Sequence, residues 1–232
     1  MTKLKDTKAI NIDNPPEDIW YLFPSHMIEC LQNLESIELK YCHSLEVIFQ
    51  LEELYAERSH MAKVLVQLRK LVPDNLPKLV HIWKKGPERI VGFQNLRLLR
   101  IEKCSGLTYL FSPSIAKLLV RLEEIEVVDC EKIEEILESA REEEKEVFFC
   151  IVNSILLKDL PNLKCFCNEA NAFEWPFLKK IRVIKCTNLR TFVPIDLKTP
   201  ELEGVFQDDE FKTRQWKGDV NATIDYIFKG KV

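Results

Sequence analysis

The stretch Leu34-Glu-Ser-Ile37-Glu-Leu39-Lys-Tyr-Cys42-His-Ser-Leu45-Glu-Val-Ile48 decides the fold, because its apolar residues and its cysteine recur elsewhere at the same intervals. Three further copies keep the cysteine and begin at Leu96, Leu122 and Leu178. Two more copies begin at Leu68 and Val152, and they have Leu-Pro where the others have the cysteine. The six leading positions are 34, 28, 26, 30 and 26 residues apart. This regular spacing is the signature of an internal repeat.

The spacing has a physical cause. In Ile37-x-Leu39 a period of two places both side chains on the inner side of a short strand. Cys42 and Leu45 then turn the chain through the interior, and Ile48 returns it along the outer arc. One coil cannot cover its own apolar face, so each coil depends on its neighbours. The sequence therefore predicts an α/β solenoid, a leucine-rich-repeat array with a parallel β-sheet on its concave face. Short helices or irregular loops are expected on the convex side, with the longest returns at residues 50–65 and 137–148.

The repeats divide the chain into three parts. Residues 1–30 are expected to form a degenerate first repeat at the N-terminal edge, where a weaker copy includes Ile10 and Ile12. Residues 31–204 hold the six repeats. The tail 205–232 breaks the period, and Asp219 is predicted to cap a short helix there. The apolar side of that helix would carry Val220, Ile224, Ile227 and Phe228. Because a terminal repeat needs covering, we expect the tail to cap the last coil.

Two features of the repeat concern single positions. Four of the eight cysteines share one slot, which in such arrays holds Asn or Cys; they are Cys42, Cys104, Cys130 and Cys186. A thiol is a small, weak donor that suits a buried bend, so we interpret these cysteines as structural. Pro73 stands where a strand aliphatic is expected. Because proline lacks a backbone donor, the second coil should be locally distorted.

Composition and motifs exclude most catalytic and cofactor-dependent functions. With 33 Lys+Arg against 37 Asp+Glu, the formal net charge is −4, which gives no reason to expect nucleic-acid binding. The sequence lacks a Walker loop, a Cys-x-x-Cys pair and a His-Glu-x-x-His motif, so we expect no cofactor, no metal and no enzymatic activity. It also lacks a secretory signal and an apolar run long enough to span a membrane. The cytoplasm is the expected location, with the nucleus as the alternative, and the cysteines are expected to be free thiols.

The concave face is the expected binding surface. The outward strand positions read from the register are Glu38, Lys40, Tyr41, Arg100, Glu102, Lys103, Glu126, Asp129, Lys158, Asp159, Lys180, Arg182 and Lys185. An acidic coil is thus followed, two coils later, by a basic coil. Apolar residues are also predicted to face outward at Val72, Leu98, Val128, Leu156 and Ile184. A surface that mixes charge with exposed aliphatic side chains suits a protein or peptide partner. The acidic run 138–146 is interpreted as a solvated insertion, with a docking site for a basic segment as the alternative.

Several blocks resemble one family in particular. They are Trp20-Tyr-Leu-Phe-Pro-Ser25, Leu76-Pro-Lys-Leu-Val-His-Ile-Trp83, Phe93-Gln-Asn-Leu96, Cys104-x-x-Leu107-Thr-Tyr-Leu-Phe-Ser-Pro-Ser-Ile-Ala116 and Leu122-Glu-Glu-Ile-Glu-Val-Val-Asp-Cys130. These blocks resemble the repeats of plant nucleotide-binding, leucine-rich-repeat disease-resistance proteins of the coiled-coil class. The tail Trp216–Phe228 resembles the carboxyl end of such chains. The resemblance covers nearly the whole sequence, but the sequence has no nucleotide-binding motif.

The resemblance implies a function and a kind of partner. In such receptors the repeats sense a pathogen effector or a guarded host protein and hold a nucleotide-binding switch off. The expected partner is therefore a protein: an effector, a guarded host protein, or the switch domain of a receptor. An alternative is the substrate-recognition repeat region of a ubiquitin-ligase adaptor, which would require an amino-terminal helical module. A third hypothesis, an enzyme, would require Cys165, Cys167 or His81 to converge in a pocket.

Overall fold

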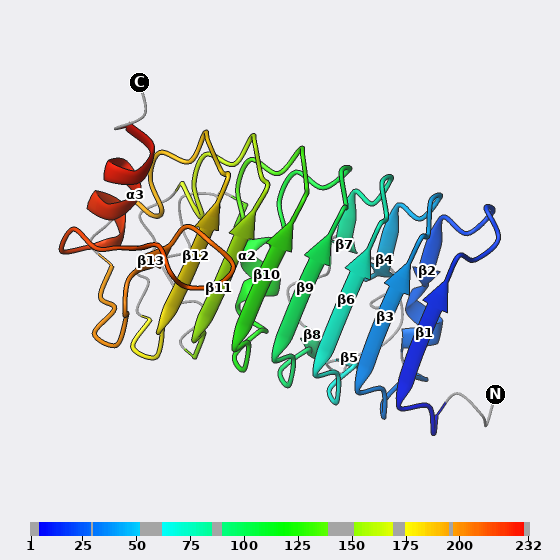
Figure 1. Cartoon of the computed structure of the whole chain (residues 1–232). Coiled ribbons are helices and arrows are strands. Elements are labelled where there is room, and N and C mark those ends of the chain that lie inside the picture. Colours follow the sequence, from blue (N-terminus) through cyan, green and yellow to red (C-terminus); the bar gives the residue numbers. More distant parts are fainter. Residues whose placement is uncertain are drawn as a thin grey trace.

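The computed structural model describes residues 5–28, 30–51, 62–84, 90–138, 151–168, 175–194 and 197–229. Successive coils stack side by side into an elongated solenoid, with the two ends of the chain at opposite ends of the stack (Figure 1). This confirms the predicted solenoid with a parallel sheet. The predicted long returns, 50–65 and 137–148, lie mostly outside the described residues.

A nine-stranded sheet runs the length of the solenoid. In their order across the sheet the strands are β1 (Ala9–Asp13), β3 (Ser36–Lys40), β6 (Lys70–Asp74), β9 (Leu98–Glu102), β10 (Glu124–Val128), β11 (Ser154–Lys158), β12 (Lys180–Ile184), β13 (Val205–Phe206) and β14 (Arg214–Gln215). All neighbours are parallel except β13 and β14, which form an antiparallel hairpin. Each coil supplies one strand, as expected for stacked repeats.

The register of this sheet follows the repeat. Ile37 pairs with Leu71, Leu71 with Leu99, and Leu99 with Ile125. The second position of every repeat strand therefore lies in one row across the sheet. At the N-terminal end Ile10 pairs with Ile37, so β1 adds a rung ahead of the six. The division of the chain into three domains remains a prediction.

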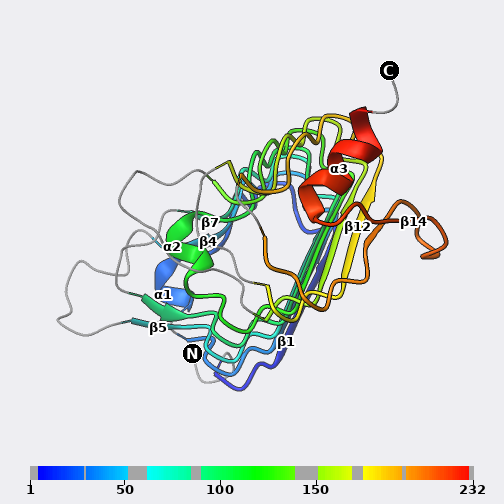
Figure 2. The same cartoon turned by 90° about the vertical axis from the view of Figure 1, so that its left-hand side faces the viewer.

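Smaller elements cover the other sides of the solenoid. Parallel strands form a three-stranded sheet of β2 (Tyr21–Phe23), β4 (Val47–Gln50) and β7 (His81–Lys84), and a two-stranded sheet of β5 (Ala62–Val64) and β8 (Ile90–Gly92). The helices are α1 (Ser25–Ile28), α2 (Pro113–Ala116) and α3 (Val220–Lys229). Figure 2 shows α1 and α2 on the side opposite the nine-stranded sheet, where short helices were expected. Helix α3 lies at the C-terminal end of the stack (Figure 1).

The core is a continuous column of aliphatic and aromatic side chains. Ile37 and Leu39 are fully buried, as are their counterparts in the later coils. Behind them the rings of Phe23, Phe49 and Trp83 stack along the solenoid axis, with centroids 5.5 and 6.3 Å apart. Rings in neighbouring coils thus cover one another, which explains why no single coil needs to bury its own apolar face.

Pro73 produces a local gap in the hydrogen-bonded ladder. It lies in β6, where it is buried and pairs with Leu39 of β3. On the other side, β6 pairs with β9 at Lys70, Leu71 and Asp74, but the ladder has no pair at Val72 or Pro73. The predicted distortion is therefore confined to the β6–β9 ladder, and the strand itself continues to Asp74.

Candidate interaction surface

The solvent side of the nine-stranded sheet, which we call the sheet face, is the surface predicted to be concave. Within β3 the burial alternates, so that Ile37 and Leu39 are buried while Glu38 and Lys40 reach solvent. The same alternation places Arg100, Glu102 and Glu126 on the sheet face. It also places Lys180 and Arg182 there, in β12. These residues therefore form one ribbon of outward side chains across adjacent rungs.

Five predicted strand positions lie one residue beyond the strand end, which corrects their assignment. Tyr41, Lys103, Asp129, Asp159 and Lys185 each follow the last residue of a strand and have positive φ angles between 52° and 55°. Asn14 and Asn75 hold the same position after β1 and β6, with φ angles of 48° and 58°. A left-handed residue reverses the chain sharply, and among residues other than glycine Asn and Asp tolerate this conformation best. The five side chains thus border the sheet face at the edge where the strands end.

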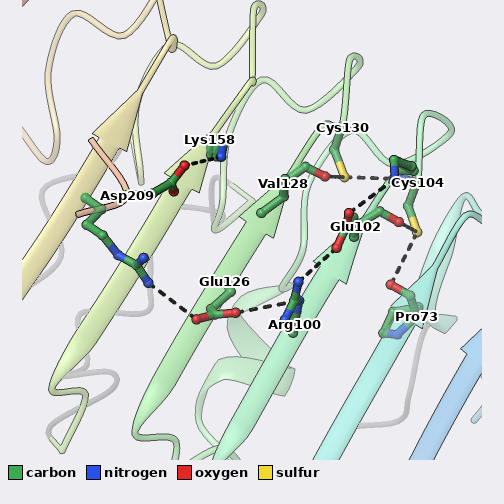
Figure 3. A network of polar contacts seen from close by, with 11 residues as sticks. Pro73, Arg100, Glu102, Cys104, Glu126, Val128, Cys130, Lys158 and Asp209 are labelled. Atoms are coloured by element: carbon green, nitrogen blue, oxygen red, sulfur yellow. Dashed lines mark hydrogen bonds and ion pairs between the residues drawn. The ribbon is translucent and has the colours of Figure 1, made fainter. Parts of the chain in front are cut away.

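Charged side chains on the sheet face are linked across coils. Arg100 contacts Glu102 at 3.0 Å in its own strand and Glu126 at 3.7 Å in the next one (Figure 3). Glu126 also lies 3.5 Å from the guanidinium of Arg182, two strands further on. Burial alone would raise the pKa of Glu102, but hydrogen bonds from Arg100 and Lys103 outweigh it and lower that pKa. The predicted acidic coil and basic coil therefore neutralise each other in part.

The N-terminal half of the sheet face is open. Glu38 accepts a hydrogen bond from Lys70 at 2.6 Å, and this bond lowers the pKa of Glu38. Lys40 at the end of β3 and Tyr41 directly after it are exposed. Val72 and Leu98 are half-buried beside Glu38 and Lys70, with which they pair in the sheet. Val128 is also half-buried, beside Glu102. This part of the face thus offers both charge and apolar surface to a partner.

The C-terminal half of the sheet face is covered by the chain itself. Strands β13 and β14 extend the sheet, and the turn between them lies across β12 and β11 on the solvent side (Figures 1 and 2). Its Asp209 accepts a hydrogen bond from Lys158 at 2.5 Å (Figure 3). Leu156 and Ile184 were predicted to face solvent, but they are only 7% and 8% exposed. That prediction is wrong because it treated the strands as uncovered.

Residues of the hairpin were missed in the sequence because they belong to no repeat. The ring of Phe211 lies 5.0 Å from Nζ of Lys180 and 5.0 Å from Cζ of Arg182. The signal was present in the run Asp208-Asp-Glu-Phe211, which is acidic and aromatic and follows a basic coil. Opposite charge and a ring near cations attract one another, so composition alone could have suggested the contact.

The slot cysteines are structural, as interpreted from the repeat. Cys42, Cys104, Cys130 and Cys186 are buried, and each thiol lies within hydrogen-bond distance of the carbonyl two residues earlier. Cys104 also contacts the carbonyl of Pro73 in the preceding coil (Figure 3). Cys186 likewise contacts the carbonyl of Leu157. Burial raises the pKa of Cys130 and of Cys186 to about 12. These thiols therefore satisfy backbone groups at the bend and stay protonated.

Of the residues in the enzyme hypothesis, Cys165 lies in an environment that disfavours the reactive thiolate. Cys165 and Cys167 are both buried, and burial followed by the charge of Glu135 raises the pKa of Cys165 to about 12. A thiolate is the reactive form of cysteine, so this environment disfavours nucleophilic chemistry. Within the described ranges, no group of three or more His, Cys, Asp or Glu side chains is placed to hold a metal ion. Among the helices of those ranges, none combines the length and apolar character needed to cross a bilayer.

The stacked coils, the parallel sheet and the cysteine slot define a leucine-rich-repeat protein. Residues 8–131 and 119–203 match the family described as "Plant disease resistance protein RPS2-like, leucine-rich repeats", and the chain belongs to this family. It is also 36% identical over 110 residues to the "Probable disease resistance protein At4g27220" of Arabidopsis thaliana. That match covers 44% of this chain and 11% of the relative, so the chain spans a small part of the relative's length.

Proposed function

We propose that this array is the non-enzymatic recognition module of a plant disease resistance protein. It binds a pathogen effector or a guarded host protein through the sheet face. The observation that carries the proposal is the ribbon of outward side chains, which runs through consecutive rungs and is open from β1 to β10. Membership of the disease resistance family supports the biological setting.

The chemistry of the open half favours a protein partner. The ion pair of Glu38 with Lys70 and the pair of Arg100 with Glu126 place both signs of charge on the sheet face. Half-buried aliphatic residues lie between these charges. Protein interfaces combine an apolar centre with a polar rim, whereas nucleic-acid sites need clustered positive charge. A chain with a net charge of −4 and mixed signs on this face therefore fits a protein.

Co-purification from pathogen-challenged plant tissue tests the proposal. The test variant is Lys40→Glu/Arg100→Glu, which reverses two exposed cations of the open sheet face. The matched control is Lys78→Glu/Lys132→Glu, which makes the same charge change in exposed turns outside the sheet. Partners that bind through the sheet face should be lost with the test variant and retained with the control. Equal recovery of every partner by both variants, at matched melting temperatures, would remove the sheet face from the proposal.

A further inference from the structure

The hairpin that covers β11 and β12 contacts the sheet face through a few specific groups at its tip. Asp209 pairs with Lys158, a residue 51 positions earlier in the chain. Phe211 places its ring against the cationic groups of Lys180 and Arg182. Phe206 of β13 packs edge-on against Phe211, with ring centroids 5.2 Å apart, so the tip is also linked to the first strand of its own hairpin.

The surface beneath the tip has the chemistry of a peptide-binding site. Lys158, Lys180 and Arg182 bring three cations together on adjacent strands. Leu156 and Ile184 add apolar surface between and beside them. The side chain of Arg182 is only 16% exposed, and its buried Nε has no hydrogen-bond partner among the residues that the structure describes. A carboxylate that pairs with Lys158 and an aromatic ring that covers the other two cations therefore complement this surface.

The tip is held in shape by hydrogen bonds of its own. The carboxylate of Asp208 accepts hydrogen bonds from the backbone amides of Glu210, Lys212 and Thr213, at 2.9, 3.0 and 2.5 Å. Phe211 has a φ of 57°, a left-handed conformation that turns its side chain toward the sheet. Such preorganisation is typical of a bound ligand, because it reduces the ordering cost of binding.

The contacts of the hairpin tip with the sheet face are nevertheless partly exposed to water. Strand β13 is anchored to β12 by two residue pairs, but the tip beyond it contacts the sheet only through side chains that the structure describes at Asp209 and Phe211. Asp209 and Phe211 remain 54% and 39% exposed, so water competes for both contacts. A partner segment with the same chemistry can therefore displace the tip at modest cost.

We propose that the β11–β12 part of the sheet face is a binding site for an acidic protein segment that carries an aromatic residue, and that the hairpin tip occupies this site until such a segment displaces it. The inference deepens the proposed recognition function and rests on it for its biological meaning. It assigns the C-terminal half of the sheet face a partner chemistry, and it assigns the hairpin the role of an intramolecular competitor.

Fluorescence anisotropy with a labelled synthetic peptide of residues 205–215, Val-Phe-Gln-Asp-Asp-Glu-Phe-Lys-Thr-Arg-Gln, tests the inference on the full chain. In the variant Asp209→Lys/Phe211→Ala the tip loses both contacts, so the site should open. The opened variant should bind the peptide at least about tenfold more tightly than the parent, because a tethered tip competes at a millimolar effective concentration. A peptide with the same two substitutions should not bind.

Reversing the cations of the site provides the specificity control. Adding Lys158→Glu/Lys180→Glu to the opened variant should abolish binding, whereas adding Lys78→Glu/Lys132→Glu should leave it unchanged. Three outcomes would each overturn the inference. They are equal affinity of the parent and the opened variant for the peptide, no binding to either protein, and binding that survives the charge reversal at Lys158 and Lys180. Should the opened variant not fold, Asp208→Ala loosens the tip without touching the sheet and must raise affinity in the same direction.

The two proposals can fail separately in these measurements. Peptide binding uses no plant partner, and its variants lie in β11, β12 and the hairpin. Partner recovery is tested at Lys40 and Arg100, in the open half of the sheet face. If partners are still recovered but the peptide does not bind, the proposed function stands, and the inferred site under the hairpin tip is overturned.

Discussion

The backbone amide of Cys104 donates a hydrogen bond to Sγ of Cys130, 26 residues further along the chain, at 3.4 Å. The Cys130 thiol lies in turn 3.3 Å from the carbonyl of Val128 (Figure 3). The slot cysteine of one coil thus joins its own bend to the bend of the preceding coil. Neighbouring coils are coupled by this contact as well as by the sheet, which gives the slot a measurable role in stability.

Replacing Cys130 by Asp should lower the free energy of unfolding by several kcal/mol. The variant places a carboxylate where the thiol is fully buried and accepts a hydrogen bond from the amide of Cys104, so a charge is buried without a cation to pair with it in that hydrogen bond. Cys130→Ala is the matched control, and it should cost about 1–2 kcal/mol through the lost hydrogen bonds and volume. Urea unfolding at pH 7 measures both. A Cys130→Asp variant as stable as Cys130→Ala would show that the slot is not a dry interior position.

Alkaline pH should weaken the parent more than the Cys130→Ala variant. Burial raises the pKa of Cys130 to about 12, against about 8.5 for a thiol in an unfolded chain. Below pH 8.5 both states are protonated and the stabilising contribution is intact. As pH rises from 8.5 toward 12, only the unfolded chain loses the proton, so the free energy of unfolding falls by up to about 1.4 kcal/mol per pH unit.

The stability difference between the parent and Cys130→Ala should therefore shrink by about 2 kcal/mol between pH 8.5 and pH 10. Urea unfolding of both proteins at these two pH values measures the change, and the comparison cancels the titration of groups that the two proteins share. A difference that stays constant with pH would contradict the assignment of a raised pKa to this buried thiol.

The repeat period explains why the core was predictable from sequence. The inward positions, such as Ile37 and Leu39, and the slot cysteines recur at fixed intervals, so any one copy identifies the others. The turn position after each strand was less visible. Asn75 and Asp129 are residue types that favour a positive φ, but Tyr41 and Lys103 are not. There the coil geometry imposes the left-handed conformation, against the preference of the residue.

The covering of the sheet face was beyond a repeat-based prediction for a different reason. The contact of Asp209 with Lys158 joins segments 51 residues apart, and it occurs only once. Periodicity carries no information about a single long-range contact. The same holds for Leu156, which has the pattern of an outward strand residue and is buried. The outward exposure of Glu38 and Arg100 does follow the period, because neighbouring repeats determine what these side chains meet.

Gly106 marks a close approach between coils, and Gly106→Ala should destabilise the protein. A Cβ at this position would lie 2.5 Å from the carbonyl oxygen of Leu79 in the preceding coil. Since backbone atoms cannot move aside independently, the stack must open locally, at a cost of about 1–3 kcal/mol. Thermal unfolding provides the measurement. The control is Gly218→Ala, where φ is 97° and a Cβ would meet no atom of the described residues within 4 Å, so backbone strain alone is expected to oppose the methyl group.

The two glycine variants differ in a way that a second substitution can reveal. At Gly106 the cost is steric, so Gly106→Val should lower the free energy of unfolding by about 1 kcal/mol more than Gly106→Ala does. If Gly106→Ala has the same melting temperature as the parent, the close approach of Gly106 to the carbonyl oxygen of Leu79 does not limit the size of the side chain at this position.

The amide of Asn221 joins α3 to the last coil, so Asn221→Ala should weaken the attachment of the helix. Its Oδ1 accepts hydrogen bonds from the amides of Phe192 and Val193 at 2.8 and 3.3 Å, and its Nδ2 donates to the carbonyl of Val193 at 2.7 Å. Asp219 begins the same helix by accepting a hydrogen bond from the amide of Ala222 at 2.8 Å, which is the expected N-cap. Losing Asn221 leaves three backbone groups of a terminal coil unpaired, at a cost of about 1–3 kcal/mol.

Urea unfolding and light scattering test whether this attachment caps the solenoid. Asn221→Ala should lower the free energy of unfolding, whereas Ala222→Ser, on the exposed side of α3, should stay within about 0.5 kcal/mol of the parent. Removing residues 218–232 should go further and promote association, because Phe192 and Val193 are buried and would then face solvent. The truncation keeps the β13–β14 hairpin, so its effect reports on α3 alone. A truncated protein that remains a monomer with the melting temperature of the parent would mean that the last coil is stable without its helix.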